Sequence, residues 1–324
     1  MNIKGAGFNK VKLITHSDFD GTTAAILTKV VFGDSADIDL LVLSQLPTAI
    51  YNVINSHDFL THQYSWLYIV DLSLSENVVD DVAVACRKNM VGFKVFDHHA
   101  TSQVLSNRPD CIIKEGTDVC GSSIYYDYLF ENLKDNSKLL AYKDLVVMTA
   151  KYDTGNWSSF NNYLANQLNS LLFILGRRRF IDRFVTDPSI KLTEAETALL
   201  LLDEERKSRY VYGKTVVIKK MYLAIPGLGT YFAGLVFAND CYTEITQDVF
   251  EKHPDIALLI IMNLPNSISY RVRPGIFDID VSKIAKYFGG GGHTMAAGNT
   301  IPSDIQDQLV SIVFNSIGAS AVVV

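Results

Sequence analysis

Short apolar runs alternate with amphipathic stretches along the first hundred residues of the chain. Four runs rich in β-branched and aromatic residues predict strands, at 10–15, 37–44, 65–71 and 92–97. Between them, three stretches repeat apolar residues at helical spacing and predict helices, at 21–33, 48–57 and 76–89. Strands that alternate with helices in this way are typical of a doubly wound, mostly parallel α/β sheet.

The pattern changes twice in the rest of the chain. Helical spacing dominates from about 119 to 212, and the segment 193–211 predicts one long helix whose Thr193 and Glu196 form a capping-box pattern. Strand-like runs then return, at 214–225, 231–238, 256–264 and 267–274. A last helix is expected at 278–288, directly before four glycines. We therefore expect three parts: a doubly wound domain, a helical linker and a smaller α/β domain, at 1–190, 191–212 and 213–324.

Composition narrows the class of protein. The 324 residues are 48% hydrophobic and 20% charged, and no apolar run approaches the eighteen or so residues of a membrane span. The beginning of the chain does not resemble a signal peptide, and the four cysteines form no C-x-x-C pair, so we expect a cytoplasmic protein without structural zinc or disulfides. The net charge of −6 argues against a broad basic face for duplex nucleic acid, but a short anionic substrate held with divalent metal remains compatible with it.

Candidate chemistry gathers where the predicted strands end. Three of the strands run into "THSDFDG", "VDLS" and "FDHHAT", and a helical stretch ends in "YDTGNW". Ligands of parallel α/β sheets bind outside the carboxyl ends of the strands, so these segments are expected to converge. The acidic and histidine residues that they contribute are His16, Asp18, Asp20, Asp71, Asp97, His98, His99 and Asp153.

A cluster of carboxylates needs cations, because like charges raise the pKa of one another. Carboxylate and imidazole ligands without thiolate suit Mn²⁺ or Mg²⁺, and Zn²⁺ less clearly. One carboxylate that bridges two ions would make a two-metal site suited to displacement at phosphorus. Each segment taken alone is equally well explained as a turn or a helix cap, and only their joint occurrence favours a metal site.

The four segments resemble, in order, the motifs of the DHH phosphoesterase superfamily. The later "SISYRVRP" and "DIDVSKIAKYFGGGGHTMAAG" resemble its accessory DHHA1 domain, so the resemblance extends over nearly the whole chain. The compact H-x-D-x-D spacing and "YDTGNW" are most similar to an oligoribonuclease (nanoRNase) branch, that of the NrnB type. The resemblance implies a DHH domain joined to a DHHA1 domain.

The resemblance also implies roles for single residues. His16, Asp18 and Asp71 would bind one Mn²⁺ ion. Asp20, His98 and Asp153 would bind a second, with Asp71 bridging the two and with Mg²⁺ or Co²⁺ as substitutes. Asp97 would orient the neighbouring histidines, and His99 would face the substrate phosphate. A water deprotonated between the two cations would be the nucleophile.

The glycine run near the end of the chain is expected to bind the substrate. It consists of Gly289, Gly290, Gly291 and Gly292. Successive backbone N–H groups in such a turn form a concave anion site, and His293 adds a donor. Arg271 would contribute a forked contact to phosphate, although Arg273 is an alternative from the same segment. The competing interpretation of the glycines is a helix end followed by a turn.

Other features are left open by the sequence. The basic run 176–183 fits phosphate contact but is more typical of a solvated face, and Trp157 fits either base stacking or a core position. Ser122 or Ser123 is expected to cap a helix or to meet phosphate. A homodimer is neither indicated nor excluded.

The function expected from these residues is Mn²⁺-dependent phosphodiester hydrolysis. The substrates would be short single-stranded RNA or DNA oligonucleotides or dinucleotides, cut to mononucleotides. Within the same class, the alternatives are a phosphodiesterase for cyclic or linear dinucleotide signals and a phosphatase for 3′-phosphoadenosine 5′-phosphate. A nucleotide-binding module without activity is the alternative from another class, but such a module would not need all six metal ligands.

Overall fold

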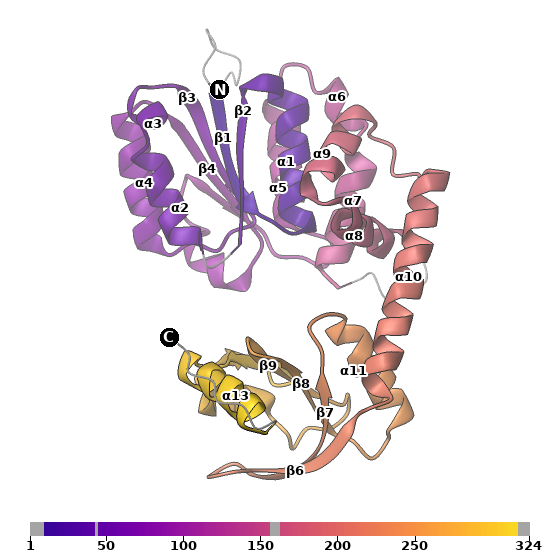
Figure 1. The fold of residues 1–324 in the computed structure, drawn as a ribbon. Coiled ribbons are helices and arrows are strands. Elements are labelled where there is room, and N and C mark those ends of the chain that lie inside the picture. Colours follow the sequence, from indigo (N-terminus) through magenta and orange to yellow (C-terminus); the bar gives the residue numbers. More distant parts are fainter. Residues whose placement is uncertain (1–9, 43–44, 156–162, 317–324) are drawn as a thin grey trace. The chain divides into compact units, whose positions relative to one another are not determined.

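The computed structural model describes residues 10–42, 45–155 and 163–316. The chain divides into two compact units, residues 1–201 and 202–324, which we call the first and the second unit (Figure 1). Each unit has a sheet of its own, so each is described by itself.

The first unit is built on a five-stranded sheet in the order β2-β1-β3-β4-β5, and every neighbouring pair is parallel. The strands are β1 Lys10–His16, β2 Ala36–Leu41, β3 Tyr64–Val70, β4 Gly92–Asp97 and β5 Cys111–Ile113. The doubly wound parallel sheet expected from the alternating pattern is thus confirmed. The sequence pattern does not predict β5, because three residues are too few for a periodic signal.

Helices cover both faces of this sheet (Figure 1). One apolar cluster joins the sheet to α1, α5 and the helices that follow it, and a second cluster joins the other face to α2, α3 and α4. The helices are α1 Phe19–Phe32, α2 Leu46–Ile54, α3 His57–Leu60, α4 Glu76–Lys88, α5 Gly121–Asn132, α6 Ser137–Leu140, α7 Lys143–Asp153, α8 Tyr163–Leu175 and α9 Arg177–Thr186. Short 3₁₀ turns lie at Gly33–Ser35 and Ala100–Leu105.

The strand order reverses beside β1, which lies between β2 and β3. Connections from the middle of such a sheet leave in opposite directions, and the resulting crevice outside the carboxyl ends is where ligands bind in this kind of fold. His16 ends β1, and Asp71 directly follows β3. The architecture therefore brings the acidic segments to one edge of the sheet.

The long helix α10 Glu194–Thr215 contains the boundary between the units. Its capping box is formed as predicted: the Thr193 backbone N–H donates to Glu196 at 2.8 Å, and the Glu196 N–H donates to the Thr193 hydroxyl at 3.2 Å. The helix continues four residues beyond the predicted end at 211. The strand expected from 214 consequently begins only at Lys219, because helical backbone geometry extends through Thr215.

The second unit holds a mixed six-stranded sheet in the order β10-β11-β9-β8-β7-β6. Its strands are β6 Lys219–Ile225, β7 Gly229–Phe237, β8 Leu258–Asn263, β9 Ser267–Val272, β10 Gly291–Gly292 and β11 Ala296–Thr300. Its helices are α11 Tyr242–Lys252, α12 Val281–Tyr287 and α13 Ser303–Ser316. Only β7 and β8 pair in parallel, and α11, which the sequence pattern did not reveal, makes the crossover between them.

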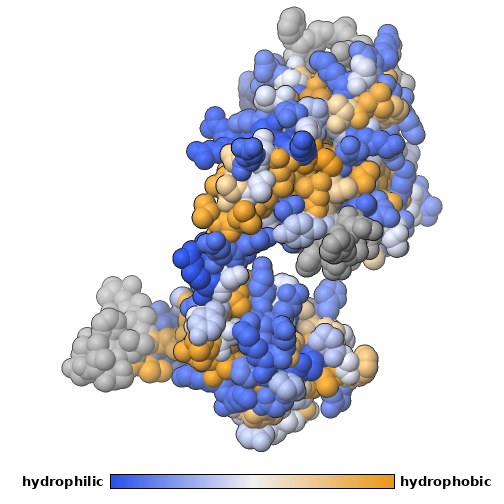
Figure 2. Space-filling view, turned by 90° about the vertical axis from the view of Figure 1, so that its right-hand side faces the viewer, coloured by the Kyte–Doolittle hydropathy of each residue, from blue (hydrophilic) through white to orange (hydrophobic). Residues whose placement is uncertain are grey.

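The surfaces of both units are mixed. On the face shown in Figure 2, hydrophilic residues cover most of each unit, and apolar residues form smaller patches between them. Within the described parts of the chain, no helix combines the length and the apolar character that crossing a membrane requires.

Candidate functional site

The turn after β1 places His16 and Asp18 side by side. Asp18 is the N-cap of α1, where its Oδ1 accepts a hydrogen bond from the Gly21 N–H at 3.0 Å. Its other oxygen lies 2.7 Å from His16 Nδ1. A Cβ on Gly21 would lie 1.9 Å from the His16 carbonyl oxygen, so the turn requires glycine there. The helix-cap interpretation of this motif therefore holds for Asp18, whose second carboxylate oxygen faces His16.

Asp71 lies at the centre of the cluster. Its side chain is 2% exposed, and its backbone is left-handed with φ 57°, a conformation that aspartate tolerates better than most residues. The first residue of α5, Gly121, packs against it so closely that a Cβ there would lie 2.8 Å from the Asp71 Cβ. A strained and fully buried carboxylate is a feature that functional sites retain.

Asp97 is fully buried at the end of β4 and receives four hydrogen bonds. Its Oδ1 accepts from His99 Nδ1 at 2.7 Å and from the His98 backbone N–H at 2.9 Å. Its Oδ2 accepts from the hydroxyls of Ser73, at 3.1 Å, and Ser102. With both oxygens occupied in this way, Asp97 is placed to orient the histidines that follow it.

Asp20 and Asp153 approach the cluster from helices. Asp20, 1% exposed, accepts hydrogen bonds from the first two N–H groups of α5, those of Gly121 at 2.7 Å and Ser122 at 2.8 Å. Helix N-termini favour negative charge, so α5 stabilises the Asp20 carboxylate where it lies. Asp153 is the last residue of α7, and its Oδ2 lies 3.1 Å from His98 Nε2.

An aromatic contact fixes the end of α7. Tyr152, the neighbour of Asp153, meets Phe19 of α1 edge to face, with ring centroids 6.0 Å apart. The Tyr152 hydroxyl also accepts a hydrogen bond from Asn169 of α8 at 2.8 Å. The direction in which Asp153 points is thus set by packing between three helices.

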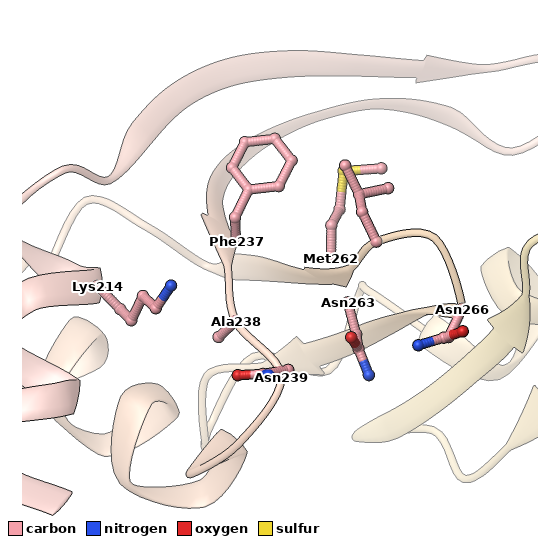
Figure 3. Close-up of a pocket in the computed structure, with 8 residues that line it drawn as sticks. Lys214, Phe237, Ala238, Asn239, Met262, Asn263 and Asn266 are labelled. Carbon is pink, nitrogen blue, oxygen red and sulfur yellow. The ribbon is translucent and has the colours of Figure 1, made fainter. Parts of the chain in front are cut away.

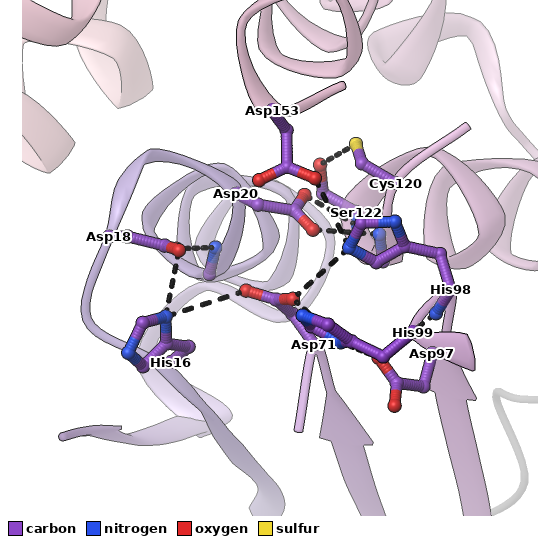
Figure 4. A network of polar contacts seen from close by, with 12 residues as sticks. His16, Asp18, Asp20, Asp71, Asp97, His98, His99, Cys120, Ser122 and Asp153 are labelled. Atoms are coloured by element: carbon purple, nitrogen blue, oxygen red, sulfur yellow. Dashed lines mark hydrogen bonds and ion pairs between the residues drawn. The ribbon is translucent and has the colours of Figure 1, made fainter. Parts of the chain in front are cut away.

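The fold brings these residues together in three overlapping groups (Figure 4). Within each group, one ligand atom per residue lies within 4.8 Å of the others, and the groups are His16 with Asp18 and Asp71, Asp20 with His98 and Asp153, and Asp71 with Asp97, His98 and His99. Three buried ligand atoms, Asp71 Oδ2, His98 Nε2 and Asp153 Oδ2, have no hydrogen-bond partner among the described residues. Buried polar atoms of this kind are normally satisfied, so their convergence fits a bound cation.

Burial and mutual repulsion raise the pKa values of three carboxyl groups in the cluster. Burial, reinforced by Asp20 and Asp18, raises the pKa of Asp153 to about 7. Burial and the same neighbours raise the pKa of Asp71 well above its ordinary value, and burial together with Asp18 raises the pKa of Asp20. The ionised forms of these carboxyl groups are thus disfavoured where they lie, and bound cations would favour them.

Two other groups of the cluster, Asp97 and His99, have pKa values that shift toward their charged forms. Burial opposes the ionised form of Asp97, but hydrogen bonds from His99 and Ser102 outweigh it and hold the pKa of Asp97 below its ordinary value. The Asp97 carboxylate in turn raises the pKa of His99. The set of carboxylates and imidazoles without thiolate can hold a hard or borderline divalent ion.

The four glycines of the second unit have mostly local explanations. Gly289, with φ 78°, ends α12: its N–H donates to the Lys286 carbonyl at 3.1 Å, and the Gly290 N–H donates to the Ala285 carbonyl at 2.8 Å, which is a Schellman cap. A Cβ on Gly290 would lie 2.1 Å from the Gly298 carbonyl oxygen, and one on Gly292 would lie 2.6 Å from the Ala297 Cα. A Cβ on Gly291 would have no described atom within 4 Å, so this glycine alone lacks a steric reason.

The structure distinguishes the two arginines of "SYRVRP". Arg273 donates to three backbone carbonyls at and beyond the end of α11, those of Phe250, His253 and Ile256, at 2.6, 2.6 and 3.0 Å. Arg271 lies within β9, half-buried, and uses Nη1 on the Ser269 hydroxyl and the Tyr270 carbonyl. Arg273 is thus committed to the backbone, whereas Arg271 retains further N–H donors.

Arg271 and His293 lie on either side of one strand. Ala296 of β11 is the register partner of Arg271, and the His293 N–H donates to the Ala296 carbonyl at 2.8 Å across a tight turn. His293 and the adjoining Gly291 and Gly292 are exposed. The predicted second-unit residues therefore form one neighbourhood.

A separate pocket of about 420 Å³ opens elsewhere in the second unit, where β7 and β8 end (Figure 3). Lys214, Asn239, Asn263 and Asn266 line it together with a few apolar side chains. It includes neither Arg271 nor the glycine run, so it does not coincide with the predicted substrate residues.

Several contacts that shape the site were not predicted from the sequence. The N–H groups of Gly121 and Ser122 hold Asp20, the hydroxyls of Ser73 and Ser102 hold Asp97, and Arg177 contacts the turn after β1. No local pattern marks them, because each acts through a contact distant in the chain. Ser123, not Ser122, caps α5, accepting from the Cys120 N–H at 3.0 Å, and Trp157 lies outside the described residues.

Comparison with known proteins supports the family that the motifs indicate. No family model matches the chain. The chain is 27% identical over 317 residues to the oligoribonuclease NrnB of Bacillus subtilis, covering 93% of this chain and 75% of that protein. This similarity confirms the resemblance of the chain to the oligoribonucleases of the NrnB type.

Two solved structures share the fold. The exonuclease RecJ bound to manganese has a TM-score of 0.55 at 13% identity, covering 96% of this chain and 90% of that one. The pGpG-specific phosphodiesterase PggH of Vibrio cholerae has a TM-score of 0.52 at 16% identity, covering 96% of this chain and all of that one. At these identities the likeness concerns the architecture, two α/β units in one chain.

Proposed function

We propose that this protein is a metal-dependent phosphodiesterase that hydrolyses short oligonucleotides and dinucleotides to mononucleotides. One observation carries the proposal: ligand groups from β1, β3, β4, α1 and α7 converge on Asp71 within one edge of the sheet, with unsatisfied buried oxygen and nitrogen atoms. Similarity to an oligoribonuclease over 93% of the chain supports the substrate class.

Two divalent ions, Mn²⁺ by preference, would occupy the cluster. His16, Asp18 and Asp71 would hold one of them. Asp20, His98 and Asp153 would hold the other, and Asp71, which lies between the two groups, would serve both. When bound, such ions activate water at neutral pH and offset the charge that develops on a phosphate.

The chain itself supplies a positioned donor beside this cluster. His99 Nδ1 is bonded to Asp97, so the ring presents Nε2 on its half-exposed side. Because Asp97 favours the protonated ring, Nε2 is available as an N–H donor to a phosphate oxygen. The hydroxyls of Ser73 and Ser102 keep Asp97 in place and thereby keep His99 oriented.

The second unit would contribute substrate-binding groups of its own. Arg271 offers guanidinium donors, His293 offers an exposed ring, and the backbone N–H groups of the glycine run from Gly289 to Gly292 offer an anion site. The proposal assigns no substrate role to Arg273, whose donors are used on backbone carbonyls.

The decisive experiment compares substrates with one purified protein. Labelled RNA and DNA of two to about twenty-four nucleotides, a linear and a cyclic dinucleotide, and 3′-phosphoadenosine 5′-phosphate would be incubated with Mn²⁺, Mg²⁺, Co²⁺ or Zn²⁺. We expect the highest kcat/KM for the shortest RNAs with Mn²⁺, and none with EDTA. Hydrolysis of the phosphomonoester or cyclic substrate alone would replace this function with one of the alternatives, and tight nucleotide binding without turnover would indicate a binding module.

A further inference from the structure

Ser17 belongs to the short turn between β1 and α1. It lies between His16, the last residue of β1, and Asp18, the N-cap of α1. Both neighbours belong to the same ligand group. Any rotation of the peptide units on either side of Ser17 would therefore turn both ligands, so whatever fixes Ser17 fixes the geometry of that half of the cluster.

Arg177 is the residue that fixes Ser17. Its Nε donates to the Ser17 carbonyl oxygen, and its Nη2 lies 3.4 Å from the Ser17 hydroxyl. Ser17 is 7% exposed, and a carbonyl in such a place needs a donor. The donor comes from 160 residues later in the chain, from the first residue of α9.

Arg177 is held in place independently of this contact. Phe180, one turn later in α9, meets Phe19 edge to face with centroids 5.9 Å apart, and both rings are buried. Phe184 of the same helix is also fully buried. Two large apolar side chains thus dock α9 against α1, and removal of the Arg177 guanidinium leaves that docking in place.

Local stability gives no reason for arginine at this position. The first turn of α9 carries Arg177, Arg178 and Arg179, whereas helix N-termini favour acidic residues, and the N-cap Gly176 offers no side-chain cap. Arg178 is exposed and makes no hydrogen bond or ion pair within the described parts of the chain. The three arginines are therefore not equivalent, and Arg178 is a matched control.

We infer that Arg177 is a positioning residue for the metal site formed by His16, Asp18 and Asp71. This inference rests on the proposed function. Arg177 touches neither the ligands nor the substrate: it acts through the Ser17 carbonyl, by holding the turn in the orientation that directs both side chains toward Asp71. Its loss weakens one of the two metal positions and leaves the position of Asp20, His98 and Asp153 intact.

Manganese titration of the full chain tests the inference. Free Mn²⁺ would be followed by electron paramagnetic resonance for the wild type, Arg177→Met, Arg177→Lys and Arg178→Met. Methionine keeps the apolar stem of arginine but removes every donor. We expect Arg177→Met to bind one ion as the wild type does and the other roughly 10- to 100-fold more weakly, the usual effect of losing such support. Arg177→Lys should recover part of the affinity, and Arg178→Met should match the wild type.

The outcomes separate the inference from the function on which it rests. If the wild type binds no Mn²⁺, the proposed function fails. If the wild type binds two ions and Arg177→Met binds both with unchanged affinity, the inference alone is overturned. Thermal unfolding in EDTA is the second readout: a melting temperature near that of the wild type supports a positioning role, and loss of both ions together with a lowered melting temperature would overturn it. Should Arg177→Met fail to fold, recovery of one weakened ion in Arg177→Lys decides.

Discussion

The acidic cluster of the first unit and the glycine run of the second have opposite effects on the stability of the fold. In the cluster, Asp20, Asp71 and Asp153 are buried together, and each raises the pKa of another or has its own pKa raised by burial. In the glycine run, three of the four glycines allow a helix end and a close strand contact. The first region carries side chains that oppose folding, and the second carries residues that folding requires.

This difference shows where function can be separated from folding. Replacing a carboxylate of the cluster removes repulsion, so activity is lost without loss of the fold. Replacing most of the glycines disturbs the backbone first, so a loss of activity there would be ambiguous. The second unit is therefore better tested at Arg271 and His293, whose side chains lie outside the glycine backbone.

The largest effect is expected at the metal ligands. Asp20→Ala and Asp153→Ala should each lower kcat on the order of a thousandfold or more, because residues that act as one unit fail together. In EDTA Asp153→Ala should unfold at the same temperature as the wild type or higher, since repulsion is relieved. Asp20→Ala also removes the acceptor of the Gly121 and Ser122 N–H groups, so its unfolding temperature should be lower than that of Asp153→Ala. The control is Asp34→Asn, at an exposed carboxylate in the turn after α1. Retained Mn²⁺-dependent turnover in either alanine variant would contradict the site.

A smaller effect is expected at the second-unit donors. Arg271→Ala and His293→Ala should lower kcat/KM for a dinucleotide roughly ten- to a hundredfold, the equivalent of about 1.5–3 kcal/mol for a hydrogen bond to a charged group. The loss should be smaller for a longer RNA, which has other contacts, and Mn²⁺ content should not change. Arg273→Ala is the contrast, because it should lower thermal stability by freeing three backbone carbonyls. Loss of metal from His293→Ala would exclude a role in substrate holding.

Two adjacent glycines should differ in their effect on stability. Gly290→Ala places a Cβ 2.1 Å from the Gly298 carbonyl and should lower the free energy of unfolding by about 1–3 kcal/mol. Gly291→Ala meets no described atom within 4 Å and should leave it unchanged or raise it by up to about 1 kcal/mol. Urea denaturation measures both. Equal destabilisation by the two variants would mean that steric demand does not explain the glycine run.

The last expected effect concerns the pH dependence of the metal-free protein. The pKa of Asp153 rises from 3.8 to about 7 on folding, so the folded chain binds this proton more tightly than the unfolded chain. The resulting stabilisation is complete below about pH 3.8 and disappears as the pH rises through about 7. Urea denaturation in EDTA should show the wild type losing stability relative to Asp153→Asn across this window. A constant difference between the two proteins would show that folding does not raise the pKa of Asp153, and Mn²⁺ should reverse the trend.

The sequence determined the first unit and the candidate ligands to a large extent. Strand and helix periods are local properties, so the alternation up to residue 97 predicts the parallel sheet, and the carboxyl ends of its strands locate His16, Asp71 and His98 at one edge. The shortest strands, β5, β10 and β11, lacked a periodic signal, and the crossover helix α11 was not recognised.

Only the tertiary structure decided what supports those ligands. Asp20 meets the α5 N–H groups across 101 and 102 residues, and Ser17 meets Arg177 across 160. It also decided between Arg271 and Arg273, which are equivalent in sequence, and assigned Gly289, Gly290 and Gly292 to backbone geometry. The physical reason is the same in each case. The period of apolar residues depends on neighbours in the sequence and can be read locally. A hydrogen bond to a backbone group or a steric contact exists only after packing has brought a distant segment of the chain close.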